Sequence, residues 1–396
     1  MSIEGAPRHV STHAAGIIVA DQPLVAYLPL HRPTKGGDTD DNPVKMVTQF
    51  PMETAESIGL LKIDFLGLST LTILRIACDL IEQHHGIKFD MSNIPFEPDP
   101  DDPETSRKVA EMFEMLGRGE SIGVFQLESS GMRQMLRGMR PKNFENIIAA
   151  ISLYRPGPMQ FIPQFNKRLH GEEKVEYLHP GLEPIIGNTY GIITYQEQLL
   201  QIAAQLFGYE LGEADLMRRA VSKKKEADLK KHRAIFIERG PDHGVDAKTA
   251  GEIFDQIEYF ANYGFNKSHA ADYAVITCQT AYLKCHYPHE YMTALMSVYR
   301  DDSSKVSLFI SDCLRMGIEI LPPNVNYSEL DFSIEAFEEA DGSISRHIRY
   351  GMAAIKNVGI GAIEHILEQR EAGVFEDLDD FLDRCDMRVV GKGALE

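Results

Sequence analysis

The chain has 396 residues, 43% of them hydrophobic and 25% charged, which is typical of a globular protein with two to four domains. Its 59 acidic residues outnumber its 40 lysines and arginines, and a net charge of −19 argues against a basic nucleic-acid coat protein while leaving local basic patches open. No stretch approaches the roughly 20 apolar residues of a membrane span. The start has no signal-peptide character. Five scattered cysteines predict a reducing cytoplasm and not a secreted disulfide scaffold.

Two strands are predicted before residue 70. The run Ala15–Ala20 predicts a buried strand, and the run 59–68 (GLLKIDFLGL) predicts another, with Lys62 and Asp64 on one face. Asp64 has two interpretations. It is either a metal-binding carboxylate with Lys62 facing the same phosphate ligand, or half of an intrastrand charge pair at a sheet surface. The spacing alone favours the second, because one aspartate is not a metal site.

Helices dominate after residue 70. Apolar spacing and a glycine stop predict a helix over 70–86, and a stripe from Phe144 to Ile151 predicts a helix that ends before Pro156. Between them, 93–105 is a proline- and acid-rich connector. Further helices are predicted over 196–207, 213–238, 247–262 and 269–286.

Three segments of this helical region carry charges suited to phosphate. Arg155 is presented by the rigid run Arg155-Pro156-Gly157-Pro158, although a carboxylate partner is the simpler interpretation. A basic cluster lies in 218–233, and its simpler interpretation is a solvated face. A glycine loop feeds a helix at 264–269, where a capped helix and a phosphate cradle are equally supported. The candidate residues of the last two segments are Arg218, Arg219, Lys223, Lys224, Lys225, Asn266, Lys267, Ser268 and His269.

The last third changes composition. Leu321-Pro322-Pro323-Asn324 marks a boundary, 335–343 indicates a hairpin tip or loop, and a helical unit begins near Tyr350. Residues 352–367 resemble a helix-hairpin-helix, whose glycine turn would grip a DNA backbone without reading its sequence; a plain helical hairpin is the alternative. The DNA-binding candidates there are Lys356, Asn357, Gly359 and Gly361. Metal-ligating clusters of cysteine and histidine are not persuasive.

The order and spacing of motifs along nearly the whole chain resemble bacterial DNA polymerase III alpha subunits, the C-family replicative polymerases. The motifs that carry the resemblance are Arg8-His9, His13-Ala14-Ala15-Gly16, Lys62 to Leu68 (KIDFLGL), Phe125 to Ser129 (FQLES), Tyr154 to Pro158 (YRPGP), Thr189 to Ile193 (TYGII), Tyr195 to Gln198 (YQEQ), Met217 to Ala220 (MRRA) with Lys223 to Lys225, and Tyr263 to His269 (YGFNKSH).

The resemblance implies an α+β, mostly helical fold: a partial mixed-sheet palm over 1–70, helical fingers over 71–325, and the start of a clamp-binding region over 326–396. It implies that Asp64 is a catalytic metal ligand with Lys62 as its companion. It implies that the basic candidates from Arg155 to His269 face the incoming nucleotide.

The implied partners and cofactor are those of DNA synthesis. They are two Mg²⁺ ions, primer-template DNA, deoxynucleoside triphosphates, the sliding clamp and other replisome subunits, with no membrane. The family's P-D-x-D-x-D type motif is not found in this sequence, so we expect the chain alone to be inactive. The alternative is a non-catalytic remnant, or a piece of a split gene, that binds DNA or nucleotide.

Overall fold

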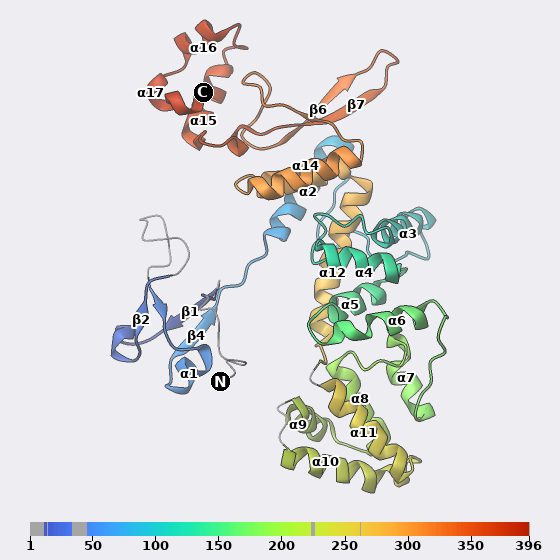
Figure 1. Cartoon of the computed structure of the whole chain (residues 1–396). Helices are drawn as coiled ribbons and strands as arrows, with labels where there is room; N and C mark the ends of the chain where they lie inside the picture. Colours follow the sequence, from blue (N-terminus) through green and yellow to red (C-terminus); the bar gives the residue numbers. More distant parts are fainter. Residues whose placement is uncertain (1–11, 14, 34–45, 223–225, 262, 396) are drawn as a thin grey trace, which may run out of the picture. The chain divides into compact units, whose positions relative to one another are not determined.

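The computed structural model describes residues 12–13, 15–33, 46–222, 226–261 and 263–395. The chain divides into two compact units, residues 1–69 and 70–396, and each is described here by itself. The fold is α+β and mostly helical, as predicted (Figure 1). No helix among the described residues has the length and apolar character needed to cross a membrane.

The first unit is built on small antiparallel sheets. Strand β1 (Gly16–Val19) pairs with β4 (Leu61–Asp64), and β2 (Leu30–His31) pairs with β3 (Val47–Thr48). A short 3-10 turn (Leu24–Ala26) and helix α1 (Met52–Ser57) complete it. The prediction of a mixed sheet over 1–70 differs from this finding, because every described strand pair in that range is antiparallel.

Among the described residues, only one face of the β1–β4 pair is covered. Leu60 packs with Leu28 and Ala55 on the inner side, where Ile18 adds to a small core. On the other side Ile17 and Leu61 are 52% and 60% exposed. The prediction of a buried strand at Ala15–Ala20 is therefore wrong, since a two-stranded sheet with one covered face leaves alternate residues in solvent.

The second unit is a succession of helices followed by a small sheet and a further helical cluster. The helices of its main body are α2 (Ser69–His85), α3 (Pro103–Gly117), α4 (Ser130–Met139), α5 (Phe144–Leu153), α6 (Ile162–Leu169), α7 (Glu183–Ile186), α8 (Gln196–Phe207), α9 (Leu211–Ser222), α10 (Glu226–Arg239), α11 (Ala247–Ala261), α12 (Lys267–His286), α13 (Pro288–Val298) and α14 (Ser303–Arg315). Short 3-10 turns lie at Pro158–Phe161, Pro180–Leu182, Gly187–Thr189 and Gly240–His243.

Most of the predicted helices are confirmed within a few residues. Helix α8 has the predicted bounds, and α5 ends at Leu153, before the proline that follows Arg155. The single helix expected over 213–238 is instead two helices, α9 and α10, and residues 223–225 between them lie outside the described residues.

The region after α14 forms a sheet and a separate helical cluster. Strand β7 (Ile344–Arg349) pairs in parallel with β5 (Ile320–Leu321) and antiparallel with β6 (Ser333–Glu338), so the predicted excursion at 335–343 is a hairpin. A 3-10 turn (Met352–Ala354) then precedes α15 (Ile360–Arg370), α16 (Leu378–Arg384), α17 (Met387–Val390) and α18 (Lys392–Leu395). This cluster has its own core, in which Ile363, Phe375 and Phe381 are buried.

Helix α12 organises the main body, because it packs against α3, α5 and α13 (Figure 1). Small side chains on its inner side, Ala270, Ala274, Cys278 and Ala281, are fully buried and let the neighbouring helices approach closely. A second core forms among α7 to α11, where Phe207 stacks on Phe236 with ring centroids 3.9 Å apart.

A buried ion pair fixes the loop between α3 and α4 onto α12. Lys284 and Asp312 side chains are 0% and 1% exposed, and Lys284 Nζ lies 2.7 Å from Asp312 Oδ2. Lys284 also donates to the carbonyl oxygens of Glu120 and Ile122, at 3.1 and 2.6 Å. Burial lowers the pKa of Lys284 from its usual value. The carboxylate of Asp312 and the two carbonyl oxygens stabilise its charge in this buried position.

We predict that Asp312→Ala lowers the free energy of unfolding by about 3–5 kcal/mol, because it leaves Lys284 buried without a counter-charge. The double variant K284M/D312L should lose much less, since neither charge remains in the core. Urea unfolding of the chain measures both values.

The matched control is Asp79→Ala, which breaks the exposed Arg75–Asp79 pair on α2 and should change stability by no more than about 0.5 kcal/mol. Equal losses in D312A and in the double variant would contradict this account of the buried pair.

Candidate functional site

Lys62 and Asp64 form an ion pair at one end of the β1–β4 sheet. Lys62 Nζ donates to Asp64 Oδ2 at 2.6 Å, so the intrastrand pair weighed from the sequence is what the structure contains. Two-residue spacing on a strand puts both side chains on one face, and only 12% of the Lys62 side chain is exposed. A side chain that is so nearly buried holds its partner carboxylate in one position.

Gly16 is the register partner of Asp64 and makes room for this pair. A Cβ at position 16 would lie 3.0 Å from His13 Nδ1, 3.1 Å from Lys62 Cε and 3.2 Å from Asp64 Oδ1. His13, Lys62 and Asp64 therefore converge on a glycine. His13 and Gly16 belong to a motif found in the sequence, but the sequence indicates no role for either residue. They meet Asp64 only through the pairing of strands that are distant in the chain.

The ion pair keeps Asp64 charged. The hydrogen bond from Lys62 lowers the pKa of Asp64 below its usual value of 3.8, and the positive charge of Lys62 adds to this. The carboxylate is therefore ionised at neutral pH and can act as a ligand or an electrostatic partner.

The described residues do not by themselves make a two-metal site. Across 12–13, 15–33, 46–222, 226–261 and 263–395, no group of three or more His, Cys, Asp or Glu could hold a metal ion. Two ions bridging a phosphate need several carboxylate ligands, and here Asp64 stands with a lysine.

Arg155 is held by backbone and aromatic contacts. Its Nε donates to the carbonyl of Ser152 at 2.9 Å and its Nη2 to the carbonyl of Tyr263 at 2.8 Å. The guanidinium carbon lies 4.1 Å from the centre of the Phe265 ring. Burial lowers the pKa of Arg155, although a guanidinium stays charged at any physiological pH. No carboxylate pairs with it among the described residues, contrary to the simpler interpretation of the sequence.

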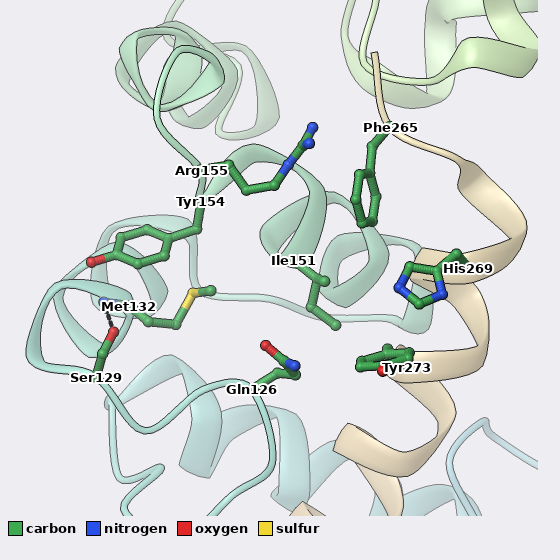
Figure 2. A pocket seen from close by; sticks show the side chains of 9 residues that line it. All are labelled: Gln126, Ser129, Met132, Ile151, Tyr154, Arg155, Phe265, His269 and Tyr273. Carbon is green, nitrogen blue, oxygen red and sulfur yellow. Dashed lines mark hydrogen bonds between the residues drawn. The ribbon is translucent and has the colours of Figure 1, made fainter. Parts of the chain in front are cut away.

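Arg155 lines a pocket of about 340 Å³ (Figure 2). One side of the pocket is lined by Phe265, which precedes α12, and by His269 and Tyr273 on its first turns. Another side is lined by Tyr154 and Arg155. The rings of His269 and Tyr273 lie 4.4 Å apart, centre to centre. The remaining lining residues are Gln126, Ser129, Met132 and Ile151.

The loop that carries Gln126 is fixed from α12 and α13. Phe125 N–H donates to Thr280 Oγ1, and Tyr291 O–H donates to the carbonyl of Gly123 at 2.7 Å. Gln126 itself has a φ of +63°, in the left-handed region that residues other than glycine seldom adopt. Long-range contacts thus hold a strained residue at the pocket wall, and no local pattern in the sequence predicts this.

The loop 264–269 begins α12 as a capped helix. Asn266 Oδ1 accepts from the backbone N–H of His269 at 2.8 Å, and the carboxylate of Glu197 accepts from the N–H of Lys267. Lys267 Nζ lies 3.1 Å from Glu145 Oε1. Ser268 is exposed. A carboxylate already sits at this helix start, where the sequence equally supported a phosphate.

The basic cluster is partly neutralised. Arg218 donates to Asp215 Oδ1 at 2.7 Å, and Arg219 lies 2.8 Å from Asp215 Oδ2. The pKa of Asp215 is lowered by the Arg218 hydrogen bond above all. Lys223, Lys224 and Lys225 lie outside the described residues.

Hydrogen bonds connect these separate segments. Arg218 Nη1 donates to Gln196 Oε1 at 3.2 Å, and Gln196 Nε2 donates to the carbonyl of Gly264. Gln196 N–H in turn donates to the carbonyl of Phe265, the residue under Arg155. The structure therefore brings together Arg155, Arg218 and the 264–269 loop, three parts of the site that are far apart in the chain.

The DNA-binding candidates near the C-terminus are accessible. Lys356, Asn357, Gly359 and Gly361 are all exposed, and a Cβ at either glycine would meet no atom within 4 Å. The first expected helix is only the 3-10 turn at 352–354, and Asn357 takes a φ of +69° in the turn before α15.

Three family models match the chain. Their descriptions are "Bacterial DNA polymerase III alpha NTPase domain" for residues 1–67, "Bacterial DNA polymerase III alpha subunit finger domain" for residues 70–244, and "Helix-hairpin-helix motif" for residues 317–396. The finger model covers the first part of the region expected to be fingers.

Curated relatives named "DNA polymerase III subunit alpha" match over the full length of the chain. The relative from Thermus aquaticus is 47% identical over 402 residues, that from Caulobacter vibrioides 43% over 397, and that from Bacillus subtilis (strain 168) 42% over 394. The chain spans 31–33% of the length of these relatives.

Two successive family models of one protein, with relatives at this identity along every part of the chain, agree with the motifs found in the sequence. The chain therefore belongs to the family of bacterial DNA polymerase III alpha subunits.

Proposed function

We propose that the chain contributes to the active centre of DNA-templated DNA synthesis, the transfer of a nucleotidyl group from a deoxynucleoside triphosphate to a primer 3′-hydroxyl. The observation that carries the proposal is the ionised carboxylate of Asp64, which is held by the nearly buried Lys62 inside a motif of the family.

Asp64 and Lys62 have distinct roles in this proposal. Asp64 is one carboxylate ligand of Mg²⁺, the ion that carboxylates and phosphate oxygens bind together in such enzymes. Lys62 keeps that carboxylate ionised and oriented, and its charge lies beside phosphate oxygens. Because no group of three or more His, Cys, Asp or Glu among the described residues could hold a metal ion, the remaining ligands are assigned to residues outside those described.

The incoming triphosphate is assigned to the side of the pocket that Arg155 forms. Arg155 is the candidate whose charge has no carboxylate partner among the described residues, whereas Arg218, Arg219 and Lys267 already have one. A preorganised cation of this kind stabilises negative charge without the cost of reorientation. His269 lines the same pocket. Further candidates are Asn266, Ser268, Lys223, Lys224 and Lys225.

Primer-template DNA is the partner, with Lys356, Asn357, Gly359 and Gly361 at its backbone. We also propose that the whole protein binds the sliding clamp and other replisome subunits. Its proposed location is the cytoplasm, without a membrane.

A second function is a non-catalytic one, in which the chain only binds DNA or nucleotide. It is supported by the ion pair with Lys62, which is the partner that Asp64 has among the described residues. The two functions differ in whether Asp64 matters for nucleotide incorporation.

We predict no primer extension by the 396-residue chain alone with Mg²⁺ and four deoxynucleotides. A chimera in which these residues replace the matching segment of the Thermus aquaticus relative should incorporate nucleotides on a template. Asp64→Asn in that chimera should lower kcat at least about a hundredfold, because it removes a charged metal ligand. Single-nucleotide incorporation in rapid quench measures it.

Asp79→Asn is the control, since that exposed aspartate pairs only with Arg75 on α2. Robust extension by the chain alone would overturn the expected inactivity. A D64N chimera within threefold of the parent would favour the non-catalytic function.

We predict that Arg155→Ala raises KM for the deoxynucleotide about tenfold to a hundredfold in the chimera, as expected for loss of a hydrogen bond to a charged group worth about 1.5–3 kcal/mol. Arg155→Lys should not restore it, because an ammonium lacks the planar fork that reaches two carbonyls and stacks on Phe265.

Arg107→Ala, on the exposed face of α3, is the matched control. If KM is unchanged in R155A while the thermal midpoint falls, Arg155 has a structural role only.

A further inference from the structure

Helix α4 and the turn after it carry a run of cations without anions. Between Ser129 and Phe144 the chain has four basic residues, Arg133, Arg137, Arg140 and Lys142, and no acidic one. In a chain of net charge −19 this composition is unusual. We name these four residues the α4 basic stripe.

The stripe occupies the last two turns of α4 and the turn that follows the helix. Arg133 and Arg137 lie one helical turn apart on α4, and Arg140 follows as the cap residue after the helix ends at Met139, so the three positions span about 10 Å along the axis. Arg137, Arg140 and Lys142 are exposed, and Arg133 is half-buried. Three arginines are thus carried by the last two turns of α4 and its cap.

The charges of the stripe are not neutralised by the protein. Across the part of the chain that the structure describes, the side chains of Arg137, Arg140 and Lys142 have no hydrogen bond or ion pair. Arg133 uses only Nε, which donates to the carbonyl of Gly119. Ion pairs do hold many other arginines, among them Arg107, Arg118, Arg168, Arg233 and Arg239.

Nearby acids are already engaged elsewhere. Glu120, one residue past Gly119, pairs with Arg118 and Arg315. Glu145, the first acidic residue after the stripe, pairs with Lys267. The positive potential of the stripe is therefore left for an external anion.

The backbone around the stripe is shaped to keep its side chains in place. Gly119 has a φ of +72°, and a Cβ there would lie 2.9 Å from the carbonyl oxygen of Arg133 and 2.7 Å from Arg137 Nη1, so the glycine lets the turn after α3 pack against the backbone of α4. Arg140 ends α4 with a φ of +49°, at a position where glycine is the usual residue. An arginine retained where glycine would be less strained points to a use for its side chain.

We infer that the α4 basic stripe binds the phosphodiester backbone of a DNA strand. The inference rests on the proposed function, which supplies DNA as the polyanion, and it assigns a surface that none of the motif residues includes. A row of arginines about 10 Å long matches two to three successive phosphates of one strand, and backbone contact of this kind fixes register without reading bases.

A structural alternative exists for the same residues. Cations at the end of a helix interact favourably with its dipole, so Arg137 and Arg140 would stabilise α4 without any ligand. The two explanations differ in what the substitutions change: DNA affinity and its salt dependence, or stability.

The test is binding of fluorescein-labelled 30-nucleotide single-stranded and 30-base-pair duplex DNA to the whole chain, by anisotropy from 50 to 300 mM salt. In R137A/R140G the plot of log Kobs against log salt should be less steep by about 1.8 on duplex and about 1.4 on single strands, for two lost phosphate contacts. The arm with the larger loss of affinity identifies the strand form bound.

Two further variants make the result decisive. R75A/R107A removes the same charge from exposed helix positions outside the stripe and should leave the slope unchanged. In R140G alone, the plot should become less steep by the amount expected for the loss of about one phosphate contact. The thermal midpoint of R140G should stay the same or rise, because glycine suits the left-handed position. R140G therefore still tests the inference if the double variant R137A/R140G unfolds more readily.

An unchanged slope of the salt plot in both R137A/R140G and R140G overturns the inference. A lower thermal midpoint of R140G together with normal DNA binding also overturns it, and that result supports the dipole explanation. Failure of the proposed function is separate. It shows as an active D64N chimera, whereas failure of the stripe shows as normal DNA binding by variants whose Asp64 is intact.

Discussion

The buried ammonium of Lys284 is the interaction on which the pocket of the helical unit depends. A charge with no exposure requires acceptors on all sides, and here they come from Asp312 on α14 and from two carbonyls of the loop after α3. The requirement fixes that loop against α12. The same loop then delivers Gln126 and Ser129 to the pocket that Phe265 and Tyr273 also line. A core electrostatic constraint thereby sets the shape of a surface site.

The sequence predicted what is local. The end of α8 at Phe207 follows from the glycine beside it, and the end of α5 at Leu153 follows from the proline after Arg155. The stiff run after Arg155 does present that side chain at a pocket. The pairing of Arg218 and Arg219 with Asp215 was also predictable, since the spacings are i,i+3 and i,i+4, but attention to positive charge alone missed it. Charge runs need to be weighed together with the acids one helical turn away.

What could not be predicted depends on contacts between distant segments. Lys284 meets the carbonyls of Glu120 and Ile122 at sequence separations of 164 and 162, and Arg155 meets Tyr263 at a separation of 108. In the first unit, alternation placed Lys62 and Asp64 on one face correctly, yet the burial of the neighbouring strand was wrong because coverage of a sheet face is a tertiary property. The role of His13 beside Asp64 was missed for the same reason.

The most direct measurement of the central claim is a crystal structure of the chimera with primer-template DNA, a non-hydrolysable deoxynucleotide and Mn²⁺ in place of Mg²⁺, with anomalous scattering to locate the metal. The account predicts a metal peak at coordination distance, about 2.1 Å, from an Asp64 carboxylate oxygen. A fully occupied nucleotide and metal, with Asp64 still bonded only to Lys62 and no metal peak within coordination distance of it, would contradict the claim.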